Sequence, residues 1–395
     1  MVTTPYSGVR VIQDANEAVA TPPAGTSTIG MIQAVTPADL PDGISVNTPI
    51  AIRKPSDAAG LPTAVKQELD TVWDNNGAAV VLTFVDAGAD ATELNANAVG
   101  DATAKTGVHA FKKATSLGLP KPKIFPTAGI AAAGVSEAGG IIAELLTVVD
   151  DMRGFIFADG PGTTIADAKT AAGLIANKRL TLTDDKILKS VSGGSTAKPS
   201  STLHAAIQSN MDLTRNVAWP AHNVTAQGII GVNRPVDFET EVTELNEEGI
   251  ATVINRGAGF KVWGPKTTAA TEAGSIWKFL SVVRTADFVN ETVEDAFYSF
   301  MGRPIIKDTL DLMTMTGRRL LRNLESQGIL LPGSQFGLAA DQSAEDGVEG
   351  IVKFGMAFEP PAPVYDLRIQ AYRRTIAYTA LFDSISGRFD VAPAA

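Results

Sequence analysis

The loop at residues 159–164 has the residue types that come closest to a phosphate-binding site. It reads Asp-Gly-Pro-Gly-Thr-Thr and lies between an expected strand and an expected helix, where nucleotide-binding folds hold phosphate. A Walker loop, however, requires Gly-Lys-Ser/Thr at the start of the helix, and no lysine stands there. Pro161 and the glycine spacing also break the GxGxxG pattern of dinucleotide sites. Thr163 or Thr164 as the helix N-cap accounts for the loop without a ligand.

The other side chains capable of chemistry do not form a catalytic set. The chain has three histidines, His109, His204 and His222, and none belongs to an HxxxH or HExxH pattern. His109 lies in an expected helix with Lys112 and Lys113, so we expect it to be partly solvated. The absence of cysteine excludes disulfides, thiolate catalysis and cysteine-type metal sites.

Three acidic pairs remain, Asp150-Asp151, Asp184-Asp185 and Glu247-Glu248. Side chains of neighbouring residues point in different directions on helices and strands alike, so such pairs are poor acid/base dyads. We expect them to be solvated. The sequence therefore predicts no catalytic residue, no metal site, no cofactor and no enzymatic activity.

The composition predicts an ordinary globular protein. A length of 395 residues favours two or three domains, and 45% hydrophobic with 19% charged residues is typical of soluble proteins. The net charge of −10 argues against a general affinity for nucleic acid. Residues 1–10 lack a signal-peptide pattern, and the most apolar stretch, residues 129–149, is interrupted by Ser136, Glu137 and Glu144. We therefore expect assembly in a cytoplasm, with no membrane or nucleic acid as partner.

The elements that position these residues alternate between strand and helix. A buried strand is expected at residues 27–35, and short strands and turns at 39–52. Further strands are predicted at residues 79–85, 123–125, 154–158 and 187–192, and helices at 103–117, 136–149 and 165–177. Such alternation implies right-handed crossovers onto one sheet. The predicted fold class is α/β, with a doubly wound, mostly parallel sheet.

Residues 245–285 predict a hairpin followed by a helix. Ile250, Val253 and Ile254 form a strand pattern that reaches a Gly-Ala-Gly turn, and a second strand is expected at residues 260–263. A long amphipathic helix is expected to begin near Gly274, with an apolar stripe over residues 275–300.

A second helix is predicted at residues 309–327, with Asp308 as N-cap and Gly328 just after its end. It carries a basic cluster formed by Arg318, Arg319 and Arg322. The cluster is either a solvated face paired with carboxylates of the same chain or a docking surface.

Both ends of the chain carry strand patterns without an evident partner. Val9, Val11 and Ile12 form a short strand on a polar tether at residues 14–25, although a frayed terminus is the alternative. Two more strands are expected at residues 350–358 and 364–375, and in the last Leu367, Ile369 and Ala371 alternate with polar residues. A lone strand needs a sheet to join, so both ends suit strand addition to another molecule.

These patterns are similar to those of contractile tail sheath proteins, and the similarity is greatest over residues 245–287. The matching positions there are Leu245, Asn246, Gly249, Ile250, Gly257, Gly259, Trp263, Gly264, Thr267, Trp277, Phe279, Val282, Arg284, Thr285 and Asp287, with Lys266 in place of the usual arginine. Weaker matches are the opening Ser-Thr-Ile-Gly at residue 27, Leu145-Leu146, residues 158–168, and Trp219, Asn223, Ile230, Gly231 and Val232.

The resemblance implies a structural subunit of a contractile phage tail sheath. Such subunits would form a helical sheath of stacked hexameric rings in the virion tail, together with tail tube, baseplate and tail terminator proteins. Contraction would drive the tube through the host envelope for genome ejection. The expected domains are an N-terminal arm at 1–25, an outer α/β domain at 26–236, an α/β C-terminal core domain at 237–358 and a C-terminal strand arm at 359–395, the two arms being exchanged between neighbours.

Two alternatives remain from the sequence. One is the sheath of a headless contractile bacteriocin or secretion system. The other, from a different class of protein, is a nucleotide-fold enzyme, which the doubly wound sheet allows but the loop at residues 159–164 does not favour.

Overall fold

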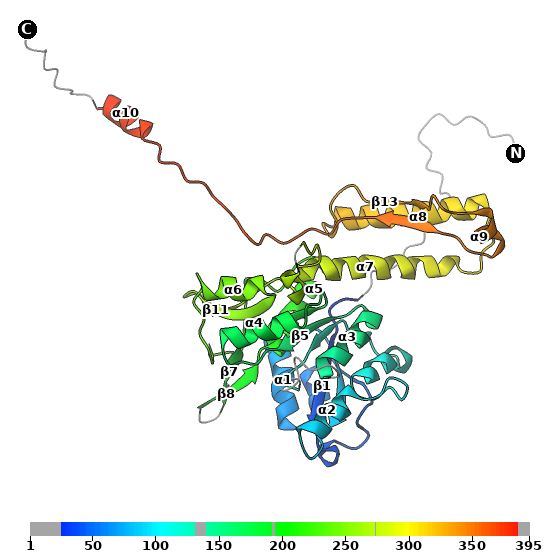
Figure 1. The fold of residues 1–395 in the computed structure, drawn as a ribbon, viewed down its shortest axis with the longest axis horizontal. Coiled ribbons are helices and arrows are strands. Elements are labelled where there is room, and N and C mark those ends of the chain that lie inside the picture. Colours follow the sequence, from blue (N-terminus) through cyan, green and yellow to red (C-terminus); the bar gives the residue numbers. More distant parts are fainter. Residues whose placement is uncertain (1–24, 131–139, 192–193, 273, 386–395) are drawn as a thin grey trace, which may run out of the picture. The chain divides into compact units, whose positions relative to one another are not determined.

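A computed structural model describes residues 25–130, 140–191, 194–272 and 274–385 (Figure 1). By its internal contacts the chain separates into two compact units, one ending at Pro363 and the other beginning at Val364. All of the sheets belong to the first unit.

The first unit is organised by a nine-stranded sheet in the order β2-β3-β1-β4-β5-β6-β11-β12-β9. Neighbours from β3 to β11 pair in parallel, whereas β2 at one edge and β12 and β9 at the other are antiparallel. The strands are β1 Ile29–Val35, β2 Ile50–Ile52, β3 Val80–Asp86, β4 Ile124–Pro126, β5 Phe155–Asp159, β6 Leu180–Thr183, β9 Val224–Thr225, β11 Ile250–Asn255 and β12 Phe260–Trp263. The mostly parallel sheet predicted from the alternation is therefore confirmed.

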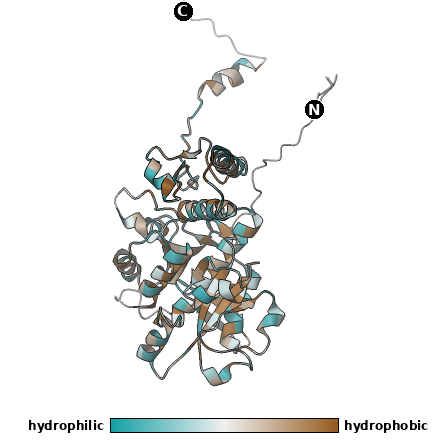
Figure 2. Cartoon of the chain, turned by 90° about the vertical axis from the view of Figure 1, so that its right-hand side faces the viewer, coloured by the Kyte–Doolittle hydropathy of each residue, from teal (hydrophilic) through white to brown (hydrophobic). Residues whose placement is uncertain are grey.

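Helices cover both faces of this sheet, because successive strand residues face opposite sides. In β5, Phe155 and Phe157 pack under α1 Thr63–Asp74 and α5 Ser201–Thr214, while Ile156 and Ala158 pack under helices on the other face. The helices of that second face are α2 Ala91–Val99, α3 Ile141–Met152, α4 Ile165–Leu174 and α6 Glu241–Glu247. Figure 2 shows the apolar strands between these helices. The fold is doubly wound.

The antiparallel hairpin of β11 and β12 extends the parallel sheet rather than starting a new one. Ile250 of β11 pairs with Leu182 of β6, so strands from both sides of the expected boundary at residues 236/237 belong to one sheet. A separate three-stranded antiparallel sheet, in the order β10-β7-β8, contains β7 Lys186–Val191, β8 Gly194–Pro199 and β10 Gly231–Val232. The strand expected at residues 187–192 therefore exists, but it lies outside the main sheet.

Two predicted helices differ from the structure. Residues 103–117, expected to be one helix, form 3-10 helices over Gly107–Lys113 and Thr115–Leu117, and Gly107 has a φ of 56° that an α-helix does not allow. The helix expected near Gly274 begins at Leu280 instead. The residues just before it pair with an earlier segment instead, since Thr267 N donates to Lys278 O, Leu280 N donates to Pro265 O, and Phe279 forms a β-bridge with Lys266.

The last part of the first unit packs two helices against a small hairpin. The elements are α7 Leu280–Phe297, α8 Lys307–Ser326, β13 Gln335–Leu338, α9 Ala344–Val348 and β14 Phe354–Ala357. Phe288, Leu321, Leu324 and Phe336 form a separate apolar core between them. A Cβ atom on Gly317 would lie 2.4 Å from the Phe336 ring, so glycine is required where α8 approaches β13.

Of the two predicted ends of α8, the N-cap is wrong and the glycine after the C-terminal end is confirmed. Asp308 lies inside the first turn, and the N-cap is Ile306. Gly328 follows the helix with a φ of 69°, as predicted. Gly328 N donates to Glu325 O and Ile329 N donates to Leu324 O, the paired bonds of a Schellman motif.

The second unit contains an extended segment and then the helix α10 Ile376–Asp383. Leu367 and Ile369 are 74% and 81% exposed, and residues 364–374 belong to no strand of this chain. Pairing of this segment with another molecule stays a prediction. Val9, Val11 and Ile12 lie outside the described residues.

Candidate functional site

The carboxyl ends of β4, β5 and β6 meet where doubly wound folds bind ligands. Asp159 ends β5 with its carboxylate buried. That carboxylate accepts hydrogen bonds from Thr127 Oγ1 at 2.7 Å, Gly129 N at 2.8 Å, Ser201 N at 3.0 Å and Ser201 Oγ at 2.8 Å. Burial raises the pKa of Asp159 despite these donors. The Asp159 carboxylate is therefore bonded by groups of the chain itself at this end of the sheet.

The loop after β5 is closed by its own hydrogen bonds. Gly162 N donates to Asp184 Oδ1 at 2.8 Å, and Asp167 N donates to the Thr164 side chain at 3.1 Å. The predicted capping of the helix by Thr163 or Thr164 is confirmed for Thr164. The Asp184 carboxylate is paired with Arg234, which also donates to Thr163 O, so the loop is bonded within the chain and the geometry gives no support for phosphate binding here.

The prediction that the acidic pairs are solvated is wrong for Asp184 and Asp185, which are both buried. Arg234 pairs with Asp184 at 2.5 Å. Asp185 Oδ2 accepts from Val253 N at 2.7 Å, and burial raises the pKa of Asp185 to about 6. The two residues lie in the turn between β6 and β7, which α5 and β11 cover. Their side chains point in different directions, but neither direction leads to solvent.

The three histidines occupy three different environments. His109 is buried, contrary to the expected partial solvation, and its Nε2 lies 2.8 Å from Glu144 Oε1. His204 stacks on Phe157, and burial lowers its pKa to about 3. His222 Nδ1 accepts from Gly264 N, and burial lowers its pKa to about 4. These rings serve packing.

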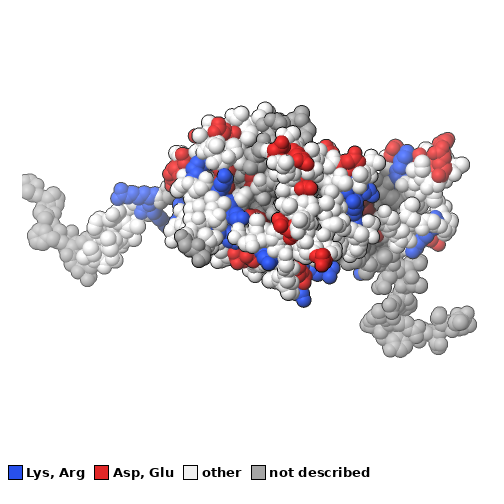
Figure 3. Space-filling view, turned by 90° about the horizontal axis from the view of Figure 1, so that it is seen from below, with Lys and Arg blue, Asp and Glu red and all other residues white. Residues whose placement is uncertain are grey.

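Neither metal ligation nor membrane insertion finds a structural basis in the described residues. No group of three or more His, Asp or Glu side chains among them is arranged to hold a metal ion. No helix in that part of the chain is both long and apolar enough to cross a bilayer. Figure 3 shows acidic and basic side chains interspersed on the face it presents.

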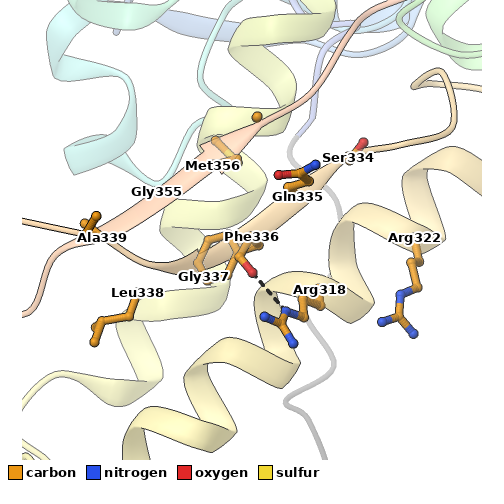
Figure 4. Close-up of a pocket in the computed structure, with 12 residues that line it drawn as sticks. Arg318, Arg322, Ser334, Gln335, Phe336, Gly337, Leu338, Ala339, Gly355 and Met356 are labelled. Atoms are coloured by element: carbon orange, nitrogen blue, oxygen red, sulfur yellow. Dashed lines mark hydrogen bonds between the residues drawn. The ribbon is translucent and has the colours of Figure 1, made fainter.

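The basic cluster of Arg318, Arg319 and Arg322 is exposed on α8. Arg318 Nε donates to Phe336 O of β13 at 2.9 Å (Figure 4). Arg318 and Arg322 line a cavity of about 770 Å³ with residues of β13 and β14, whereas Arg319 does not. Across the described residues, none of the three forms a salt bridge, although Arg322 interacts electrostatically with the Glu325 carboxylate, so both alternatives for the cluster stay predictions.

A row of ion pairs joins α7 to the sheet and its helices. Four residues of α7, spaced by three and four positions and so on one face, each meet an opposite charge. The pairs are Arg284 with Asp212, Asp287 with Arg179, Glu291 with Lys121 and Lys123, and Glu294 with Arg153. We call this row the α7 seam, and Figure 1 shows α7 between the sheet and α8.

The α7 seam was missed from the sequence, although its spacing gave a signal. Arg284 and Asp287 were noted only as matching positions, and the charged stripe that continues through Glu291 and Glu294 was overlooked beside the apolar one. Burial lowers the pKa of Lys123 to about 8 even though Glu291 lies beside it. The seam shows that charged residues here are structural.

Comparison with known proteins agrees with this geometry. Residues 128–268, from the end of β4 through β12, match the family model of the phage tail sheath protein central domain. The chain is 26% identical over 364 residues to a prophage major tail sheath protein of Pseudomonas aeruginosa, covering 87% of this chain and 91% of that protein. It is 25% identical over 296 residues to the tail sheath protein of Burkholderia phage BcepMu, covering 70% and 61%.

Solved structures show the same fold. A chain of the anti-feeding prophage baseplate superposes with a TM-score of 0.70 at 17% identity, over 94% of this chain and 100% of that chain. A chain of the contracted PVC sheath complex, an extracellular contractile injection system, gives 0.69 at 19% identity, over 95% and 100%. The resemblance noted in the sequence is confirmed: residues 128–268 match the tail sheath family model, and the chain is similar to tail sheath proteins over most of its length.

Proposed function

We propose that this protein polymerises around a phage or prophage tail tube and that contraction of the polymer drives the tube through the host envelope for genome ejection. The observation that carries the proposal is the segment at residues 364–374, whose alternating apolar side chains are exposed and which has no strand partner in its own chain. An exposed strand pattern of this kind is stable only when it joins another sheet.

The partners follow from the same proposal. Subunits form a helical sheath of stacked hexameric rings, assembled in the host bacterial cytoplasm, and the sheath contacts tail tube, baseplate and tail terminator proteins. The free energy of contraction comes from new contacts between subunits, without catalytic turnover. Support comes from the edge of the sheet, where Ser201 and Thr127 bond the Asp159 carboxylate and the loop at residues 159–164 carries no lysine.

Exchange of the terminal arms holds the polymer together. In this proposal Val9, Val11 and Ile12 of one subunit, and Leu367, Ile369 and Ala371 of another, pair with strands of a neighbour. Each arm adds about four to six backbone hydrogen bonds worth roughly 0.5–1.5 kcal/mol each. The tether at residues 14–25 spans at most about 36–43 Å, so neighbours can slide and rotate only within that reach.

Deletion of residues 1–19 tests the exchange. The expected result is a folded monomer that forms no cylinders in the electron microscope, because residues between Ile29 and Phe358 form the apolar cores described above. The matched control keeps residues 1–19 and lengthens the tether by several Gly/Ser residues, which preserves the polymer but weakens coupling between rings. Cylinders of normal length from the deletion variant would contradict the proposed exchange.

Docking onto an acidic patch of the tube or of a neighbouring subunit is the proposed role of the cluster Arg318, Arg319 and Arg322. Exposed ion pairs contribute only about 0–1 kcal/mol each, but a lattice repeats them. Because Arg318 already bonds the hairpin, the test reverses Arg319→Glu and Arg322→Glu together. We expect weaker assembly with an altered salt dependence.

The control variant for this experiment has the same net charge as the variant with Arg319→Glu and Arg322→Glu. Arg303→Glu with Lys307→Glu reverses two exposed charges near the start of α8, and assembly should change less than with the Arg319 and Arg322 pair. The monomers of both variants should melt like the parent. Equal effects of the two double variants on assembly across a salt series would mean that the cluster is only a solvated face.

A further inference from the structure

The three residues that precede β1 receive hydrogen bonds from three different parts of the molecule. Thr26 O accepts from Arg284 Nη2 of α7 at 3.2 Å, and Ser27 O accepts from Ser209 Oγ of α5 at 2.7 Å. Thr28 O accepts from two successive backbone nitrogens where β4 begins, at 2.9 and 3.2 Å. We call residues 26–28 the arm root, because they join the expected N-terminal arm to the sheet.

The donor from α7 is itself held in place by a buried carboxylate. The Arg284 guanidinium donates to both oxygens of Asp212, at 2.9 and 2.5 Å, and the two side chains are 5% and 0% exposed. Gln208 Nε2 donates to Asp212 Oδ1 at 3.0 Å, so the carboxylate is fixed within α5. A bidentate pair sets both the position and the plane of the guanidinium. Thr26 O therefore meets a donor whose place is determined by two helices.

The arm root leads directly into an interior strand of the sheet. β1 pairs in parallel with β3 over seven positions, from Ile29–Val80 to Val35–Asp86, and has β4 on its other side. Because ladder hydrogen bonds run across the strands, a pull along β1 loads many of them together. A pull across the strand end would instead load the first bonds one after another. Bonds that hold residues 26–28 in a fixed path keep the pull from reaching the end of β1 sideways.

We propose that Arg284 is the positioning residue that clamps the arm root, so that load carried by the N-terminal arm enters the molecule through α5, α7 and the interior of the sheet. This inference rests on the proposed exchange of arms, since only an arm held by a neighbour carries load. Among the described residues of α7, Arg284 is the one whose side chain bonds the root. The ion pair with Asp212 alone does not require that bond.

A nitroxide label beside the root tests the clamp in the monomer. Gly25→Cys gives the chain its only cysteine, and a Cβ atom at Gly25 meets nothing within 4 Å. Arg284→Lys keeps a positive charge, but a single nitrogen cannot reproduce the fork that serves Asp212 and the root together. The spectrum of the label should therefore shift toward faster motion. Ser209→Ala, which removes the donor to the next carbonyl of the root, should shift it in the same direction.

The matched control is Arg234→Lys, also with the label at position 25. Arg234 pairs with the buried Asp184 at 2.5 Å and donates to the backbone oxygen of Thr163, so it makes the same kinds of bond as Arg284 but does not bond the arm root. Both lysine variants should lose stability, whereas only Arg284→Lys should change the motion of the label. An unchanged spectrum in Arg284→Lys, or the same change in both variants, would overturn the inference.

Contraction tests whether the clamp bears load. Unlabelled Arg284→Lys protein should still form cylinders, because pairing of the arms does not need the clamp. On triggering, these cylinders should break into short pieces more often than cylinders of Arg234→Lys. Electron micrographs before and after contraction count the intact cylinders, and equal breakage in the two variants would contradict the load-bearing role. If the parent protein forms no cylinders, the proposed function fails, whereas the label still reports whether Arg284 clamps the root.

Discussion

At the scale of single residues, burial decides the chemistry of this protein more than sequence spacing does. Asp185 shows this best. Its carboxyl group is buried between β6 and β11, and its pKa of about 6 lies above the ordinary value near 3.9. Because the folded state holds this proton more tightly, the stabilisation is fully present below about pH 4 and is lost as the pH rises through about 6.

Asp185→Asn should therefore change how stability depends on pH. The amide keeps an acceptor for Val253 N but cannot ionise, so the variant should gain stability relative to the parent between pH 4.5 and 7.5. We expect a relative gain on the order of 1–3 kcal/mol. Urea unfolding at pH 4.5 and at pH 7.5 measures this relative gain. The control is Asp151→Asn, a substitution at an exposed aspartate. The same difference between variant and parent at both pH values would contradict the prediction.

Residue environments were the part that the sequence predicted least well. The capping by Thr164 could be predicted because it depends on a local backbone position. The burial of Asp185 and His109 could not, because it depends on which distant elements cover them. Asp185 bonds a residue 68 positions away, and His109 contacts Glu144 on a different helix.

At the scale of elements, the α7 seam makes the attachment of one helix depend on charges of unequal burial. Within it, Glu291 is only 13% exposed in its side chain, and Lys123 only 6%. Glu291→Gln should destabilise the protein by roughly 2–4 kcal/mol, because Lys123 is left buried without its counter-charge. The control is Glu294→Gln, whose partner Arg153 and own side chain are more exposed, and which should cost about 0–1 kcal/mol. Denaturant unfolding measures the loss of stability in each variant. Equal losses would contradict the expected difference between the buried and the exposed ion pairs of the α7 seam.

Element boundaries were predictable where the signal was local. Gly328 ends α8 because only a residue tolerating positive φ completes the Schellman bonds. The start of α7 was misplaced because residues 277–280 bond residues 265–267, a contact that no helical pattern reveals. The helix expected at 103–117 failed at Gly107 for a conformational reason that the apolar pattern does not show.

At the scale of the whole molecule, a sheath that contracts through contacts between subunits needs neither nucleotide nor metal. We expect contraction of assembled cylinders to proceed unchanged when ATP is omitted or a chelator is added. The measurement is sheath length in electron micrographs after triggering. Contraction that requires ATP, or that a chelator abolishes, would revive the enzyme hypothesis.

The doubly wound architecture was predictable because short apolar strands and helices alternate along the chain. The continuation of the sheet into β11 and β12 was not, since the pairing of Ile250 with Leu182 joins segments nearly seventy residues apart. The arms and the basic cluster were singled out as candidate sites from pattern alone. Which edge of which strand each segment meets depends on backbone geometry that a sequence does not state.

The α7 seam has a mechanical consequence. An apolar contact between two bodies tolerates sliding, because one methyl group replaces another at little cost. A row of ion pairs at fixed spacing resists sliding, since a shift of one helical turn in one direction would bring Arg284 to Arg179, and a shift in the other would bring Asp287 to Asp212. In the proposed sheath, shear applied at the β13–β14 hairpin would therefore meet resistance at α7 before it reached the sheet.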